Sequence, residues 1–204
     1  MRVGRFATQV GYSVVGALVL VSLSPSRALA QDDHSHMLTA AHQEQTPAQR
    51  QQAGALVKAV RQATAQFQNV ENAGPDYALQ FGCVSGGDFG AMGMHFVNGS
   101  LVDGDIDVNH PEILLYEPLP NGRLRLTGAD YLVTKDAWEA NPKHTAPPEL
   151  MGQLFHLFDS PNRFGLPPFY TLHVWAWKDN PNGTFGNWNP DVSCDAFNPS
   201  TPEN

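Results

Sequence analysis

Residues 113–127, ILLYEPLPNGRLRLT, have the pattern of a β-hairpin. An apolar run ends at the turn-forming letters PLPNG, and a second run follows in which Leu124 and Leu126 alternate with Arg123 and Arg125. Because neighbouring side chains of a strand point to opposite faces, this second strand has one apolar and one polar face. The hairpin predicts an antiparallel sheet as the main element of the fold.

Two further segments complete the predicted fold. Residues 169–178 (FYTLHVWAWK) read as another strand. A helix is predicted over about 47–68, with Thr46 as N-cap, Pro47 at its first position and apolar residues recurring every three or four positions. We therefore predict an α+β domain in which one N-terminal amphipathic helix packs on a mostly antiparallel β-sheet or partial barrel.

The first thirty residues have the pattern of a secretory signal peptide. Arg2 and Arg5 precede an apolar run of about ten residues, and small residues at Ala28 and Ala30 predict cleavage after Ala30. The remaining predicted parts are a disordered leader at 31–45, a single domain at 46–195 and a disordered tail at 196–204. We expect a secreted or periplasmic protein.

The two cysteines fit an exported protein. Cys83 and Cys194 lie 111 positions apart and lack CxxC spacing, which argues against a redox motif or a zinc ribbon. In an oxidising compartment two such cysteines most simply form a disulfide, and we predict that bond.

Charge and hydropathy limit the partners. The chain carries 12 basic and 20 acidic residues, a net charge of −8, and therefore offers no surface for nucleic acid or an anionic membrane. After signal cleavage no apolar stretch is long enough for integral membrane association. We expect an unidentified small-molecule partner and a monomer or small homo-oligomer.

Several segments share a pattern with a known group of proteins. They are GAMGMHFVNGSLV (90–102), HPEILLYEP (110–118), GRLRLTGADYLV (122–133) and LHVWAWKDNPNGTFGNWNPDVSC (172–194). Together they resemble a family of exported bacterial proteins of unknown function, with the patterns GMGxHxVN, PExLxYEP and LHVWAWxxNPxGxFxxWNPxVSC. The resemblance implies one domain over residues 55–194 and implies no activity.

Four histidines lie within apolar segments and are candidate metal ligands, since imidazole is a common ligand. Glu117 shares a strand face with apolar residues, and a buried acid needs a cation, a metal or a hydrogen-bond donor. The predicted site for zinc, copper or iron draws on His95, His110, Glu117, His156 and His173. Alternatively, the histidines are core side chains bonded to carbonyl groups, and Glu117 pairs with Arg123 or Arg125 across the hairpin.

A second hypothesis concerns the aromatic residues of the 169–178 strand. Period two places Trp175 and Trp177 on the face of His173, where they could line a pocket for a small apolar ligand. The same rings could equally belong to the core. The chain has no GxSxG, HExxH, Walker or GxGxxG motif, which argues against the enzyme classes that these motifs mark. Whether the protein is an enzyme stays open, and a structural envelope-associated protein is a third hypothesis.

Overall fold

A computed structural model describes residues 45–198, in which a helix comes first and a sheet follows. The elements that build the core are α2 (Pro47–Thr64), β1 (Ala78–Ser85), β2 (Ala91–Val97), β3 (Ile113–Pro118), β4 (Leu124–Thr134), β7 (His156–Phe158) and β8 (Phe169–Val174). Smaller elements are the helix α3 (Lys135–Ala140), the strands β5 (Glu149–Leu150) and β6 (Gln153–Leu154), and four 3₁₀ turns, Ala65–Gln68, Val70–Ala73, Gly87–Phe89 and Gly99–Leu101.

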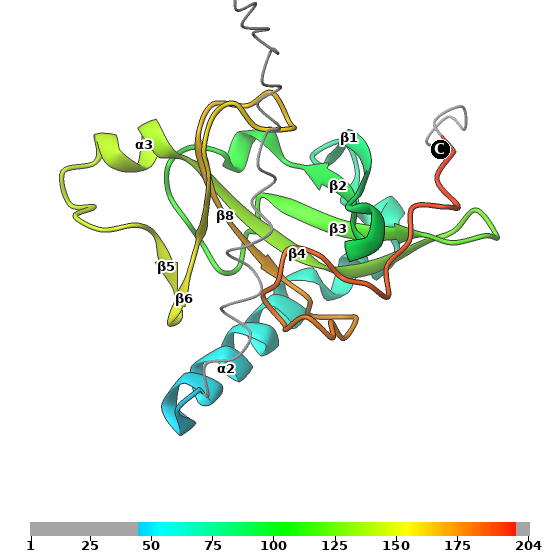
Figure 1. Cartoon of the computed structure of the whole chain (residues 1–204), viewed down its shortest axis with the longest axis horizontal. Coiled ribbons are helices and arrows are strands. Elements are labelled where there is room, and N and C mark those ends of the chain that lie inside the picture. Colours follow the sequence, from blue (N-terminus) through cyan, green and yellow to red (C-terminus); the bar gives the residue numbers. More distant parts are fainter. Residues whose placement is uncertain (1–44, 199–204) are drawn as a thin grey trace, which may run out of the picture. The chain divides into compact units, whose positions relative to one another are not determined.

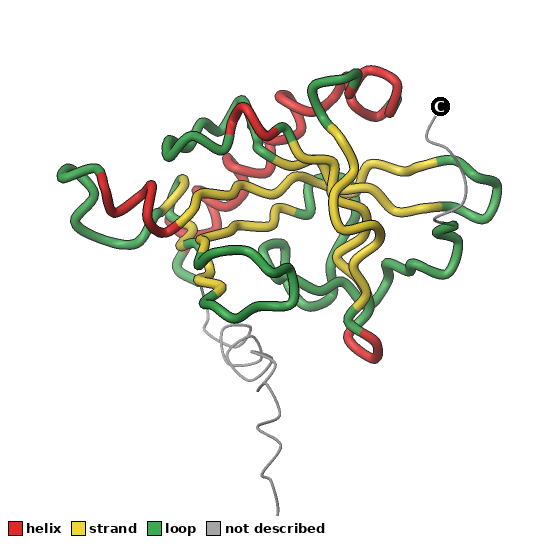
Figure 2. The backbone as a smooth tube through the Cα atoms, turned by 90° about the horizontal axis from the view of Figure 1, so that it is seen from above, coloured by secondary structure: helices red, strands yellow, loops and turns green. Residues whose placement is uncertain are grey.

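The main sheet has six strands in the order β1-β2-β3-β4-β8-β7, and every neighbouring pair is antiparallel. The first four strands follow one another as a meander, and β8 then pairs with β4 and carries β7 on its outer edge. The sheet curls, as Figure 2 shows from above. The α+β class with an antiparallel sheet is thus confirmed.

The predicted helix start is confirmed by its cap. The Gln49 N–H donates to Thr46 Oγ1 at 3.2 Å, and the Thr46 N–H donates to Gln49 Oε1 at 2.8 Å, which satisfies two backbone donors at once. Leu56 and Val60 are fully buried against the sheet, which α2 crosses on one face (Figure 1). The helix is the first described element rather than an N-terminal one, because 44 residues precede the described part.

The hairpin is confirmed, and the last strand differs from its prediction. Glu117 lies opposite Arg125 in the β3–β4 ladder, as the pattern of residues 113–127 indicated. Strand β8 ends at Val174, before the predicted end at residue 178, because the next backbone groups turn to other partners. The Trp175 N–H donates to the Thr184 carbonyl at 3.0 Å, and the Trp177 N–H donates to the Thr127 carbonyl at 2.9 Å.

The two faces of the sheet have different neighbours. One face packs on α2 and the turns that follow it, with apolar side chains and three tyrosines, Tyr77, Tyr116 and Tyr131. Each tyrosine hydroxyl donates to a backbone carbonyl at 2.7–2.8 Å, so the buried hydroxyls are satisfied. The opposite face carries the polar residues described below.

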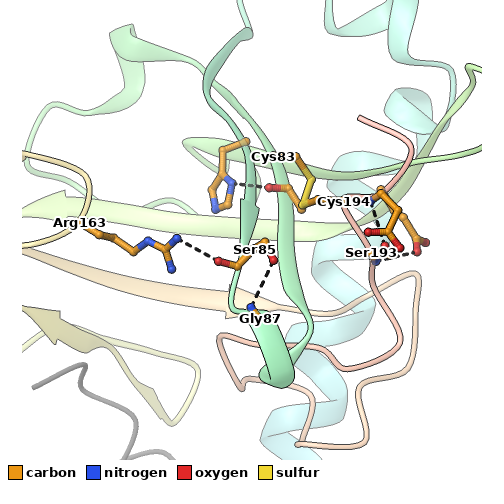
Figure 3. The surroundings of a disulfide bond; sticks show 10 residues. Cys83, Ser85, Gly87, Arg163, Ser193 and Cys194 are labelled. Atoms are coloured by element: carbon orange, nitrogen blue, oxygen red, sulfur yellow. Dashed lines mark hydrogen bonds between the residues drawn. A yellow bond between two sulfur atoms is a disulfide. The ribbon is translucent and has the colours of Figure 1, made fainter. Parts of the chain in front are cut away.

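The predicted disulfide is confirmed. Cys83 on β1 bonds Cys194 near the end of the described chain, with Cα atoms 5.7 Å apart (Figure 3). Such a bond is consistent with an oxidising extracellular or periplasmic location. The predicted signal peptide and most of the predicted leader lie outside the described residues. Phe197, beyond the predicted domain end, packs against the cluster around Tyr116. None of the described helices is long and apolar enough to cross a membrane.

Candidate metal centre

Three buried side chains from three strands meet on the sheet face opposite α2. They are His95 on β2, Asp130 on β4 and His173 on β8, and one ligand atom from each lies within 4.8 Å of the others. The ladder explains the meeting, because Asp130 is paired directly with His173. All three residues are at most 5% exposed.

Gly93 positions His95. Its φ of +92° is one that side-chain-bearing residues rarely adopt, and a Cβ there would lie 2.5 Å from the Tyr116 carbonyl oxygen. In the β1–β2 ladder Val84 pairs with Gly93 and Ser85 with Ala91, so Met92 is an extra, unpaired residue. Because of this bulge, Met92 and His95 line the same pocket, although an odd separation would place them on opposite faces of a regular strand. His95 Nδ1 lies 3.1 Å from the Gly93 carbonyl, which can only accept, so Nδ1 carries the proton and Nε2 keeps its lone pair.

Asp130 and His173 lie close together, and only His173 is incompletely bonded. Asp130 accepts hydrogen bonds from the backbone N–H groups of Tyr131 and Leu172. Thr171 Oγ1 donates to Asp130 Oδ1 at 2.5 Å. His173 Nδ1 is 3.3 Å from the same oxygen, yet the direction is not that of a hydrogen bond, and both ring nitrogens of His173 lack a hydrogen-bond partner. Within the described residues no lysine or arginine pairs with Asp130. Buried polar atoms are normally satisfied, so this cluster has ligand atoms to spare.

Burial dominates the electrostatics of the cluster. It lowers the pKa of His95 to about 4 and that of His173 well below its usual value. It raises the pKa of Asp130 to about 7, although hydrogen bonds from Thr171 and from the backbone of Leu172 and Tyr131 oppose that shift. Nearby, burial and then the charge of Asp130 raise the pKa of Glu112 to about 8, while the Leu132 N–H donates to Glu112 Oε2 at 3.1 Å. At neutral pH both histidines are therefore unprotonated, the form that binds metals.

A narrow pocket opens above the cluster. Thr171, whose hydroxyl donates to Asp130, also lines it. The other walls are apolar and come from β1, β2, β3, β4, β7, β8 and the loop before β8: Phe81, Met92, Ile113, Leu132, Phe158, Phe164, Leu166 and Phe169. The free volume is about 30 Å³. This volume admits water-sized molecules.

Two predicted ligands lie elsewhere. The Glu117 carboxylate accepts hydrogen bonds from Arg125 and from Lys178 Nζ at 2.9 Å, the pairing that the hairpin allowed as an alternative. His110 is exposed, and its Nδ1 lies 2.8 Å from Asp107 Oδ2. Neither residue belongs to the cluster of His95, Asp130 and His173.

His156 lies beside the cluster without belonging to it. It is half-buried on β7, opposite Thr171, and its charge contributes to lowering the pKa of His173.

The two predicted ligand-binding tryptophans do not line the pocket. Trp175 is buried and donates from Nε1 to the Gly186 carbonyl at 2.5 Å. Trp177 Nε1 donates to Thr64 Oγ1 of α2 at 2.9 Å, so this ring packs on the helix side. Trp175 keeps the face of His173, since their ring centroids lie 6.5 Å apart, whereas Trp177 leaves that face because β8 ends at Val174.

Comparison with known family models, with characterised proteins and with solved structures finds no match. The resemblance drawn from the sequence patterns stays a prediction, and the geometry of the cluster alone carries the functional interpretation.

Proposed function

We propose that His95, Asp130 and His173 bind one divalent transition-metal ion and that the protein is a metal-binding, metal-dependent protein. The observation that carries the proposal is the convergence of three buried ligand atoms within 4.8 Å, with both ring nitrogens of His173 lacking a hydrogen bond. Leaving such groups unpaired costs about 1–3 kcal/mol each, and a metal bond to one His173 nitrogen would remove that cost for that nitrogen.

The ligand set favours particular metals. Two imidazoles and one carboxylate suit zinc or iron, whereas magnesium and calcium prefer oxygen ligands alone. Three protein ligands leave further coordination positions, a feature of catalytic rather than structural sites. The Thr171 hydroxyl and the Gly93 carbonyl would orient Asp130 and His95, as outer partners do in known metal sites. The metal would supply a Lewis acid or a redox centre.

The competing interpretation is a purely structural polar cluster. In that case Asp130 would be buried either as a protonated acid or as a charge without a basic partner, and burying an unpaired charge costs folding free energy. The contrast with Glu117, which has two basic partners and a bond from the Ser193 N–H at 3.4 Å, favours the metal.

The test is elemental analysis of the full chain, produced without a histidine tag and exported by its own N-terminal segment. The wild type is compared with Asp130→Asn and with His110→Asn, a matched control in an exposed His–Asp pair. We expect about one metal per chain in the wild type and in His110→Asn, and none in Asp130→Asn. A metal-free wild type that also fails to bind zinc, iron or copper added afterwards would refute the proposal.

A further inference from the structure

Phe81 stands at the entrance of the pocket. It lines the pocket and is 50% exposed, whereas His95, Asp130 and His173 at its base are almost fully buried. The other half-buried wall residues are Leu132, Phe158, Phe164 and Leu166, so the opening to solvent lies on this side. A molecule that enters from this side passes between Phe81 and these residues.

The backbone holds Phe81 there in an unfavourable conformation. Gln80 pairs with His95 and Cys83 with Met94, so Phe81 and Gly82 form a two-residue bulge in β1. Both have φ of +64°, which glycine tolerates and a bulky aromatic residue rarely adopts. Such conformations persist where the surroundings impose them, and they cluster at functional sites.

Neighbouring contacts fix the Phe81 ring and its bulge. The ring meets Phe164 edge-on with centroids 5.5 Å apart, and Phe164 meets Phe158 and Phe169 edge-on at 6.0 Å. Phe197 lies against Gly82, and the disulfide anchors the chain at Cys83. Figure 3 shows Arg163 reaching across from the loop that carries Phe164 to the Ser85 carbonyl, with a hydrogen bond of 2.9 Å.

We propose that Phe81 determines which molecules reach the centre, admitting those of water or azide size and excluding ring compounds. This inference rests on the proposed function for the identity of the centre, whereas the restriction at Phe81 belongs to the pocket itself. The free volume is only about 30 Å³, on the scale of water-sized molecules, so we expect a ring compound to enter only when Phe81 is shortened.

The first experiment needs no metal. Diethyl pyrocarbonate, which modifies unprotonated imidazole and is much larger than azide, is applied to metal-free full-length protein, and peptide mass spectrometry follows His173 and His110. We expect His110 to react rapidly and His173 to be protected in the wild type. In Phe81→Ala the modification of His173 should accelerate at least tenfold. Phe89→Ala is the matched control, because Phe89 is 38% exposed and does not line the pocket.

The second experiment uses the cobalt(II)-loaded protein and its visible spectrum. Azide should bind the wild type, and 4-phenylimidazole should bind at least tenfold more tightly to Phe81→Ala than to wild type or Phe89→Ala. Circular dichroism and thermal unfolding confirm that each variant is folded, and Phe164→Ala provides a second way to open the entrance.

The outcomes separate the two proposals. If cobalt, zinc, iron and copper all fail to bind, the proposed function fails, and the modification rate of His173 still decides the role of Phe81. If cobalt binds but 4-phenylimidazole enters the wild type as readily as azide, the size restriction is refuted and the metal site stands. Equal His173 rates in folded wild type, Phe81→Ala and Phe164→Ala would also overturn the inference.

Discussion

Two carboxylates buried in the same sheet, Glu117 and Asp130, have opposite surroundings. Glu117 is 6% exposed and accepts hydrogen bonds from Arg125, Lys178 and the Ser193 backbone. Burial would raise its pKa, but the two cations outweigh burial and the pKa is lowered. Asp130 has no basic partner of this kind in the described residues, faces two histidines, and has a raised pKa.

The difference separates a structural site from a functional one. A buried charge whose partners are all present holds the fold in register, and nothing further is needed to explain it. A buried acid surrounded by neutral imidazoles is stable only with a proton or an added cation. The Glu117 site is therefore an internal ion pair, and the Asp130 site is where we expect an external ion.

Removing the disulfide should have the largest effect and should reach both sites. Ser193, which contacts Glu117, adjoins Cys194, and Phe81, above Asp130, lies two residues before Cys83. For a loop of 111 residues the chain-entropy model gives about 4–5 kcal/mol for Cys83→Ala/Cys194→Ala. Urea unfolding of the oxidised wild type and the double variant measures this loss. An unchanged free energy of unfolding would mean that the bond adds nothing to either region.

Exchanging each acid for its amide should affect stability in one variant and metal affinity in the other. Glu117→Gln removes a charge from a half-exposed ion-pair network, and we expect a loss of stability of about 1–2 kcal/mol with metal binding retained. Asp130→Asn removes an uncompensated buried charge, so the stability of the metal-free protein at pH 8 should hold or rise, while metal affinity falls at least about 100-fold, or roughly 2.7 kcal/mol. Thermal unfolding and competition titration measure both quantities. If one variant lost more than the other in both stability and metal affinity, the distinction between the Glu117 and Asp130 sites would be contradicted.

The pH dependence of metal affinity should report Asp130 alone. The pKa of Asp130 is about 7, so below pH 7 a metal ion must displace its proton, and the affinity should fall about tenfold per pH unit between pH 7 and pH 5. The histidines add no further slope in this range, because the pKa of His95 is about 4 and that of His173 is well below its usual value. Affinity titrations from pH 5 to pH 8.5 test this dependence. A steeper fall would show that the histidines also lose protons on binding, and a flat profile would remove Asp130 from the ligands.

The smallest predicted effect concerns the hydroxyl that orients Asp130. Thr171→Val removes the hydrogen bond to Asp130 Oδ1 at nearly constant volume, and we expect about a tenfold loss of metal affinity. Thr127→Val is the matched control, because this equally buried hydroxyl donates to the Leu115 carbonyl, away from the cluster. Isothermal titration of both variants should show a loss of affinity in the first only. Equal affinities in the two variants would count against any role of Thr171 in the centre.

The sequence predicted α2, the β3–β4 hairpin, β8 and two of the three clustered residues, but it predicted no bounds for α3, β1, β2 or β7. The caps, the hairpin and the face of His173 follow from local patterns, which the observed register preserves. Asp130 was not predicted because β4 carries a bulge opposite Leu115 and Tyr116. Simple alternation places Asp130 on the apolar face of Leu126, and the extra residue moves it to the pocket face. Asp130 on a predicted apolar face nevertheless indicated a buried acid that needs a partner.

The face of Trp177 was predicted wrongly for a related reason. Alternation assigns a face only while the strand continues, and the departure of the chain after Val174 depends on hydrogen bonds to Thr127 and Thr184. Thr127 lies 50 residues before its partner Trp177, and Thr184 lies 9 residues after its partner Trp175, so no local pattern marks the end of the strand. Similarly, the pairing of Glu117 with Lys178 joins residues far apart in the sequence.

The most direct test of the central claim is a crystal structure of the full chain soaked in zinc, with anomalous diffraction recorded at the zinc edge. We predict one strong peak at about 2.0–2.2 Å from a nitrogen of His95, a nitrogen of His173 and an oxygen of Asp130. A zinc peak only at an exposed pair such as His110 and Asp107, with none at the buried cluster, would contradict the claim.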